Sequence, residues 1–144
     1  MIEKMPFGKR AWYPHMKPGD VEVWNRFIDR SPDAYKEVAY DVAVGEGAPI
    51  EEGTEENIAK GYTILTQRKI DVIGFDGDQV HVIEVKPIAT PKAVGQIEWY
   101  LELFKNEPDG NKNAIGVLIS HIADRDVAAF AEKKGIRLII LGQS

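Results

Sequence analysis

Three charged residues stand in or directly beside two short apolar segments, 70–75 and 80–85. They are Asp71, Glu84 and Lys86. Successive side chains of a β-strand point to opposite faces, so Glu84 and Lys86 project to the same side of their strand. Charged groups are costly to bury without a partner. These residues therefore predict either a site that receives an ion or a buried ion pair.

The tripeptide 76–78, Asp-Gly-Asp, separates the two segments and predicts a β-hairpin. A turn at its first two residues pairs Asp71 with Val82, whereas a turn at its last two pairs Asp71 with Glu84. Both registers place Asp71 on the face that carries Glu84 and Lys86. The hairpin thus gathers two carboxylates and one ammonium on a mostly apolar sheet.

Two converging carboxylates suit a hard divalent cation such as Mg²⁺, for which Mn²⁺ often substitutes, because it prefers oxygen ligands and retains water. A lysine beside the carboxylates can orient a metal-bound water and stabilise charge that develops on a phosphate. The alternative is purely structural: Lys86 forms a buried ion pair with Glu84 or with Asp71. Spacing alone does not separate these two interpretations.

A helix is predicted over residues 91–105, directly after the hairpin. Thr90 is a suitable N-cap and Pro91 suits the first helical position. Gln96 and Tyr100 are four residues apart and share one face of this helix. That face lies beside the expected core stripe, which consists of Ile97, Leu101 and Phe104. Gln96 and Tyr100 are therefore expected either to flank a site or to pack as a tyrosine beside a hydrogen-bonded amide.

The stretch 68–105 resembles the PD-(D/E)XK nuclease superfamily, and in particular its RecB-like subgroup with a Gln-x-x-x-Tyr helix. The resemblance rests on Asp71, on Glu84-Val85-Lys86, and on Gln96 and Tyr100. It implies a restriction-endonuclease-like fold in which Asp71 and Glu84 bind Mg²⁺ and Lys86 assists the attacking water. It also implies that Gln96 and Tyr100 lie near the active site and a nucleic-acid substrate, expected to be DNA.

Further candidate site residues are identified by their position around the stretch 68–105. Arg68, Lys69 and Lys92 are candidate phosphate contacts, with ordinary surface charges as the alternative. Members of this superfamily often carry an additional acid on a helix ahead of the sheet. Glu22 is the candidate for it, although surface solvation is the simpler interpretation. Ile70 replaces the nominal proline of the family pattern.

Two other titratable side chains lie near this pattern in the chain. His81 falls on the strand face opposite Glu84 and is expected to be a satisfied core or interface histidine. Asp41, on a predicted strand over 35–44, is expected at an exposed or edge position. It approaches the metal site only if its strand neighbours the hairpin.

Composition indicates a globular protein of one domain: 144 residues, 44% hydrophobic and 28% charged. The chain contains no cysteine, which excludes disulfides and thiolate metal sites. The net charge of −5 argues against a simple electrostatic binder of nucleic acid. The charge is segregated, however, with bases concentrated in residues 1–18 and glutamates in residues 46–56.

The sequence contains neither a standard signal peptide nor an apolar run long enough to span a membrane. The expected location is the cytoplasm, or a virion if the gene belongs to a phage. Residues 1–19 are predicted to form an irregular arm, because prolines and glycines interrupt their aromatic residues. Trp12 and Tyr13 either stack on bases or pin the arm to the domain.

The remaining residues, 20–144, are predicted to form a single three-layer α/β sandwich with a mixed sheet and flanking helices. The expected element order is α-β-β-β-α-β-α-β. The expected elements are a helix from Asp20 to about Arg30, a strand over 35–44, an acidic loop over 45–61 that can include a helical turn near 55–60, strands over 63–75 and 80–85, the helix over 91–105, a strand over 114–120, a helix capped by Asp124 and reaching Lys134, and a strand over 136–141.

Two functional hypotheses follow. The first is a Mg²⁺-dependent nuclease that hydrolyses DNA phosphodiester bonds. The second is a catalytically inactive protein that keeps the nuclease fold as a binding or assembly module, encoded by a phage or mobile element. Endonucleases of this fold often work as dimers, so a homodimer is an expectation of the resemblance and not of any particular residue.

Overall fold

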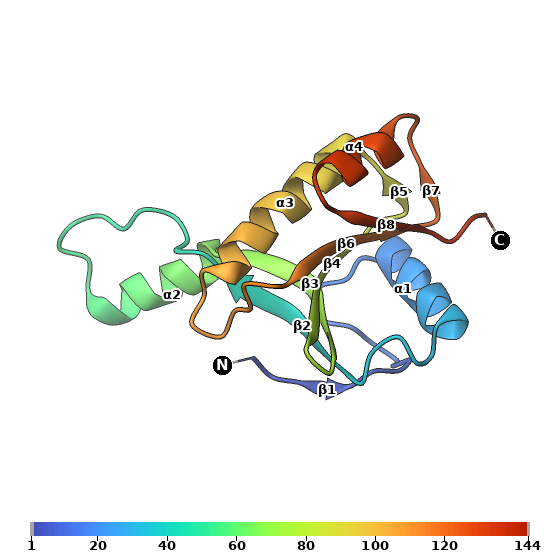
Figure 1. The fold of residues 1–144 in the computed structure, drawn as a ribbon. Coiled ribbons are helices and arrows are strands. Elements are labelled where there is room, and N and C mark those ends of the chain that lie inside the picture. The colour runs from blue at the N-terminus through green and yellow to red at the C-terminus, as the bar shows by residue number, and fades with distance from the viewer. Residues whose placement is uncertain (1, 144) are drawn as a thin grey trace.

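A computed structural model describes residues 2–143 (Figure 1). A β-sheet forms the middle layer, with α1 on one side and α3 and α4 on the other. The elements, in chain order, are β1 (Met5–Pro6), α1 (Pro18–Arg30), β2 (Glu37–Val44), α2 (Glu56–Thr66), β3 (Arg68–Asp76), β4 (Gln79–Val85), β5 (Ile88–Ala89), α3 (Pro91–Lys105), β6 (Ile115–Ser120), β7 (Ile122–Ala123), α4 (Val127–Lys133) and β8 (Arg137–Ile140). Among these helices, none has the length and apolar character that a membrane span requires.

The main sheet has six strands in the order β1-β2-β3-β4-β6-β8. The pairs from β1 to β4 are antiparallel, whereas β4 pairs with β6 and β6 with β8 in parallel. A second, small sheet consists of β5 and β7, which pair in parallel. The mixed sheet and its flanking helices confirm the predicted fold class.

Apolar side chains pack on both faces of the sheet. On one face, Trp24 and Phe27 of α1 pack with Val72 and Ile83 of the hairpin. On the other face, Ile97 of α3 packs with strand β6 and with α4, and other residues of α3 pack on β2, β3 and β4. Strands buried on both faces explain the nearly continuous apolar runs of β4 and β6.

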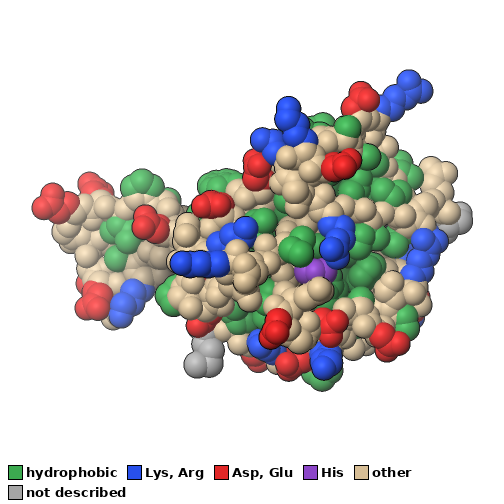
Figure 2. All heavy atoms as spheres, viewed as in Figure 1, with side chains coloured by type: hydrophobic (Ala, Val, Ile, Leu, Met, Phe, Trp, Pro, Cys, Tyr) green, Lys and Arg blue, Asp and Glu red, His purple; other side chains and the backbone are tan. Residues whose placement is uncertain are grey.

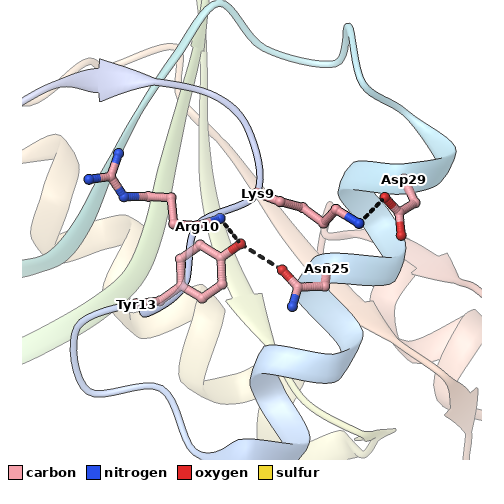
Figure 3. A network of polar contacts seen from close by, with 5 residues as sticks. All are labelled: Lys9, Arg10, Tyr13, Asn25 and Asp29. Carbon is pink, nitrogen blue, oxygen red and sulfur yellow. Dashed lines mark hydrogen bonds and ion pairs between the residues drawn. The ribbon is translucent and has the colours of Figure 1, made fainter.

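The N-terminal arm is held against α1 (Figure 3). Tyr13 is fully buried, its hydroxyl donates to Oδ1 of Asn25 at 2.6 Å, and it accepts from the backbone N–H of Arg10 at 3.0 Å. Lys9 forms an ion pair with Asp29 at 2.8 Å. Tyr13 thus pins the arm to the domain, whereas the neighbouring Trp12 remains 71% exposed.

The predicted strand over 63–75 is wrong in its first part. Residues 56–66 form α2, and β3 begins only at Arg68. Both carboxylate oxygens of Glu55 cap this helix by accepting from the N–H groups of Asn57 and Ile58 at 3.1 Å. The acidic loop is therefore shorter than expected, and a helix projects from the sheet at this point (Figure 1).

Other boundaries also differ from the prediction, three of them by two residues or more. Helix α1 starts at Pro18, after the N-cap Lys17, so Asp20 lies in its first turn and is not the cap. Strand β2 starts at Glu37, two residues later than expected. Helix α4 starts at Val127, because residues 122–123 pair with β5 and the left-handed Asp126 precedes the helix.

Candidate active site

The site forms where the pairing of β3 with its neighbours is interrupted. The ladder between β3 and β4 ends at Val72 opposite Ile83, in the register that places Asp71 opposite Glu84. Beyond it, Oδ2 of Asp71 accepts from the backbone N–H of Val85 at 3.1 Å. The carboxylate of Asp71 thus takes the place of a backbone carbonyl as the acceptor for the N–H of Val85. Of the two predicted turns, the one at Gly77-Asp78 produces this register.

On its other side, β3 pairs with β2 on either side of Asp71 but not at Asp71 itself. The register places Asp41 opposite Asp71, and Asp41 has a left-handed backbone with φ of 53°. Its carboxylate lies 3.2 Å from Nε2 of His15 in the N-terminal arm. Asp41 therefore lies on the strand that neighbours the hairpin, which is the condition under which it could approach the site. The residue that its carboxylate contacts, however, is His15.

Glu84 is the most deeply buried acid of the site, with 1% of its surface exposed. Its Oε2 lies 3.4 Å from Nε2 of Gln96, which donates to it, whereas the buried Oε1 has no hydrogen-bond partner. Burial raises the pKa of Glu84 well above its ordinary value, and the neighbouring charge of Asp71 raises it further. The charge of Lys86 lowers the pKa of Glu84 and so acts against both effects, but the buried Oε1 is left without a hydrogen-bond partner within residues 2–143.

The first helix contributes a buried acid, but this acid is Asp20 and not the candidate Glu22. Asp20 is 8% exposed, whereas Glu22 lies at the surface. Burial raises the pKa of Asp20, the charge of Asp71 raises it further, and the charge of Lys86 lowers it. Asp20, not Glu22, therefore faces the hairpin acids. The helical spacing of Asp20 from the buried residues Val23, Trp24 and Phe27 is the signal that identifies it.

Helix α3 places two predicted residues beside the acids. Its N-cap is Thr90, whose Oγ1 accepts from the N–H of Ala93 at 3.1 Å, as predicted. Gln96 contacts Glu84 directly. Tyr100 is half-buried, and burial and then the charge of Glu84 raise its pKa. The structure therefore brings Gln96 and Tyr100 to the side of the site, while Ile97 and Phe104 fill the core.

The three candidate phosphate contacts differ in their surroundings. The guanidinium of Arg68 lies over the ring of Trp99, 4.9 Å from its centroid. Lys92 is exposed and lines a pocket of about 410 Å³ together with Lys86 and Gln96. The ammonium of Lys69 instead donates to a backbone carbonyl at the C-terminal end of α2 at 2.6 Å.

His81 lies outside this group, in the core as predicted, but it is not fully satisfied, because its buried Nε2 has no hydrogen-bond partner in the described part of the chain. It is 6% exposed, and its Nδ1 forms a hydrogen bond with the hydroxyl of Tyr35 at 2.7 Å. Burial lowers the pKa of His81, which keeps its imidazole neutral. His81 is thus a packing residue with one hydrogen-bond partner.

The oxygen atoms of Asp71 and Glu84 are the ones that fit a metal ion. A cation would partner the buried Oε1 of Glu84 and offset the repulsion between two neighbouring carboxylates. Within residues 2–143, no group of three or more His, Asp or Glu side chains is arranged as a complete metal-binding set. A pair of carboxylates is nevertheless typical of Mg²⁺, which usually keeps several water ligands.

Among the solved structures compared with this chain, one with a TM-score above 0.5 has the same fold. A crystal structure of a repair endonuclease from Pyrococcus abyssi is 21% identical, with a TM-score of 0.51, over 93% of this chain and 50% of that one. The EndoMS–dsDNA2 complex is 19% identical with a TM-score of 0.48, covering 96% and 52%. EndoMS in its apo form is 26% identical with a TM-score of 0.43, covering 50% and 34%. The chain thus spans about half the length of these proteins or less.

No curated protein sequence matches the chain. A family model does match, however, over residues 40–143, which include the hairpin, α3 and every strand from β3 to β8. Its description is the C-terminal domain of the endonuclease NucS. A match over this much of the chain shows that the protein belongs to the NucS C-terminal domain family.

Proposed function

We propose that this chain is a metal-dependent nuclease domain that hydrolyses phosphodiester bonds of DNA. The observation that carries the proposal is the pair of carboxylates at the interrupted hairpin, Asp71 and Glu84, with one buried oxygen left without a partner. Such a pair is unfavourable in a purely structural role, because it concentrates negative charge in a low-dielectric setting. It is favourable around a divalent cation.

Asp71 and Glu84 would hold the ion, for which Mg²⁺ is the expected species and Mn²⁺ the expected substitute. A bound Mg²⁺ supplies Lewis-acid stabilisation of charge on a phosphate oxygen and lowers the pKa of bound water. Gln96 fixes the orientation of the Glu84 carboxylate by donating to Oε2. This hydrogen bond leaves Oε1 as the free binding atom.

Lys86 would position the attacking water. It is half-buried, and its charge acts on both Asp20 and Glu84. Its ammonium can donate hydrogen bonds, so its proposed task is to orient the water and stabilise the developing negative charge. Asp20 would keep Lys86 and Asp71 in place, and Tyr100 would border the same space.

DNA as the substrate is supported by family membership, because the family is described as an endonuclease and a solved protein of the same fold is described as a repair endonuclease. Arg68 and Lys92 are the best-placed cations for backbone phosphates, since Arg68 lies over Trp99 in the middle of α3 and Lys92 lies in its first turn. Lys69 is a weaker candidate, because its ammonium already donates a hydrogen bond to a backbone carbonyl of α2.

The test is cleavage of labelled single-stranded, duplex and branched DNA with Mg²⁺, Mn²⁺ or a chelator. Glu84→Ala and Lys86→Ala are the site variants. Glu102→Ala and Lys112→Ala are the matched controls, because both residues are exposed. We expect metal-dependent cleavage that both site variants lose by at least about 1,000-fold and both controls keep.

Metal-dependent cleavage that persists in Glu84→Ala would refute the site assignment. Absence of cleavage on every substrate, with folded protein and no bound Mn²⁺, would favour the non-catalytic binding module instead. Folding of each variant is checked by circular dichroism before activity is compared.

A further inference from the structure

The turn that precedes α1 holds a histidine in a backbone conformation that histidine rarely adopts. His15 has a φ of 56° and follows Pro14, in a turn that is closed by a hydrogen bond from the N–H of Met16 to the carbonyl of Tyr13 at 3.4 Å. A proline followed by a residue of positive φ defines a type II turn, in which glycine ordinarily occupies the position of His15. A side chain costs free energy there, and strain of this kind clusters at active sites.

A second strained residue lies against the first. Asp41 has a φ of 53°, and its Oδ2 lies 3.2 Å from Nε2 of His15. Among the non-glycine residues that the structure describes, only one other, Asp126, has a positive φ. The pair adds little to the core, because the side chain of His15 is 78% exposed. A contact between two strained residues from separate segments therefore indicates a role other than packing.

Both segments of this pair lead to the candidate active site. The register of β2 and β3 places Asp41 opposite Asp71, and the Cα atoms of such cross-strand neighbours are about 4.5–5.5 Å apart. On the other segment, Asp20 follows in the first turn of α1 and faces the same acid. The imidazole of His15 thus lies at the edge of the site, beside the strand next to Asp71.

The turn that carries His15 is fixed on both sides. Before it, Tyr13 is fully buried, and its hydroxyl donates to Oδ1 of Asn25 at 2.6 Å (Figure 3). After it, α1 begins at Pro18 and packs on the sheet through Trp24. The imidazole is therefore held in place although it is exposed. The carboxylate of Asp41 occupies Nε2 and leaves Nδ1 as the nitrogen for a second partner.

Hydrolysis of a phosphodiester requires a proton for the oxygen that leaves. Asp71 and Glu84 are proposed to hold the ion and Lys86 to position the attacking water, which leaves protonation of that oxygen to another group. Histidine is the side chain that most often transfers protons in enzymes, since it changes charge near neutral pH. A carboxylate on one ring nitrogen fixes the orientation of the ring, so that the other nitrogen meets the substrate.

We propose that His15, oriented by Asp41, is the general acid that protonates the leaving oxygen, an inference that rests on the proposed nuclease function. The oxygen of the attacking water forms a bond to phosphorus while the bond from phosphorus to the leaving oxygen breaks. Nδ1–H of the imidazolium gives its proton to the leaving oxygen. The proton of the attacking water passes to solvent, from which the imidazole regains its own.

The test compares an ordinary DNA linkage with bridging phosphorothiolates, in which sulfur replaces either the 3′ or the 5′ oxygen of the scissile linkage. A leaving thiolate needs no proton, so the substrate with sulfur in the leaving position bypasses the general acid. The cleavage products of the ordinary linkage identify which of the two substrates this is. All reactions contain Mn²⁺, so that the metal ion is the same for oxygen and sulfur.

The variant is His15→Asn, because asparagine tolerates a positive φ and can still donate to Asp41. We expect it to cleave the ordinary linkage at least about 100-fold more slowly than the wild type, and the substrate with leaving sulfur within about threefold of the wild type. Asp41→Asn should show the same pattern with a smaller loss, about 10-fold, because the ring remains but is less well oriented.

His15→Gly separates backbone strain from chemistry. Glycine suits this turn, so the melting temperature should not fall, whereas cleavage of the ordinary linkage should fall as in His15→Asn. Two controls should cleave every substrate like the wild type. Asp126→Asn changes the other residue of positive φ. Glu52→Gln changes an exposed acid of the lobe that α2 and its preceding loop form, where Figure 2 shows acidic side chains gathered at the outer end.

Full activity of His15→Asn on the ordinary linkage would overturn the proposal, as would an equal loss on the ordinary and the sulfur-containing linkage. A His15→Gly protein that loses both stability and cleavage of every substrate would show that the residue is structural. A wild type that cleaves no substrate would overturn the nuclease function and this inference with it. Normal cleavage by His15→Asn beside an inactive Glu84→Ala would overturn the inference alone.

Discussion

Replacement of Glu84 by glutamine is expected to stabilise the metal-free protein while it removes the proposed activity. Glu84 is fully buried, one of its oxygens has no partner, and Asp71 lies beside it. Glutamine keeps the size of the side chain and removes the charge. Glutamine still places a polar atom at the position of Oε1, so the gain comes from removing a buried charge that lies beside another carboxylate. We expect a gain of about 1–3 kcal/mol at about pH 8.

The gain depends on pH, and its sign follows from the raised pKa of Glu84. The unfolded chain titrates near the ordinary value of 4.5, whereas the folded protein holds the proton to higher pH. Stability is therefore greatest below that ordinary value and falls as pH rises toward the folded pKa. The fall is about 1.4 kcal/mol for each pH unit in that interval. The glutamine variant lacks this contribution.

The assay is urea unfolding with a chelator present, at about pH 8 and about pH 5. The control is Glu102→Gln, an exposed position where a change within about 0.5 kcal/mol is expected. Addition of Mg²⁺ should stabilise the wild type by about 2.7 kcal/mol at a hundred times its Kd, and the variant by much less. A variant less stable than the wild type at the higher pH would show that the carboxylate is already compensated by its neighbours, and the reasoning would fail.

Three further predictions concern other residues. Asp20→Asn should lower metal-dependent cleavage about 10- to 100-fold without loss of stability, since Asp20 positions charged neighbours; full activity would exclude that role. Because burial lowers the pKa of His81, the contribution of His81 to stability should fall as pH falls below about 6.5. In urea unfolding, a folded His81→Gln variant should therefore gain stability relative to the wild type as pH falls through this range, and a difference that does not change with pH would contradict the reasoning. Gly74→Ala should lower the free energy of unfolding by about 1–3 kcal/mol, because its Cβ would lie 2.6 Å from the ring of Tyr35. Gly95→Ala on α3 is the matched control, since its Cβ meets no atom within 4 Å and should stabilise the protein by up to about 1 kcal/mol. Equal effects of the two substitutions would contradict the packing argument.

The hairpin and the helix that follows it were predictable because local signals decide them. The turn residues, alternating strand positions and the Thr90 cap act over a few residues and agree with the tertiary packing. The position of Gln96 beside the site was expected from its helix face, whereas its contact with Glu84 was not predicted. Whether these residues perform the predicted catalytic roles is a separate question, which the cleavage experiment addresses.

Other features depend on information that local patterns do not carry. The β-branched residues at the end of α2 favour a strand locally, and no core contact identifies the segment as a helix. Asp20 has the residue type of an N-cap, so its place in the first turn emerges only when the buried spacing of α1 is known. Strands β5 and β7 are two residues long and are defined by their pairing with each other. Neither segment shows a sequence pattern that predicts a strand.

The small β5–β7 ladder links two loops that leave the main sheet at the same edge. Ile88 follows Lys86 by two residues, and its partner Ile122 follows the end of β6. The backbone N–H of Asp124 also donates to the carbonyl of Ala89 at 2.9 Å. In hydrogen exchange, these amides should therefore open together as one cooperative unit. A fluctuation that displaces Lys86 from the acids would have to release the loop after β6 at the same moment, although the two segments lie more than thirty residues apart in the chain.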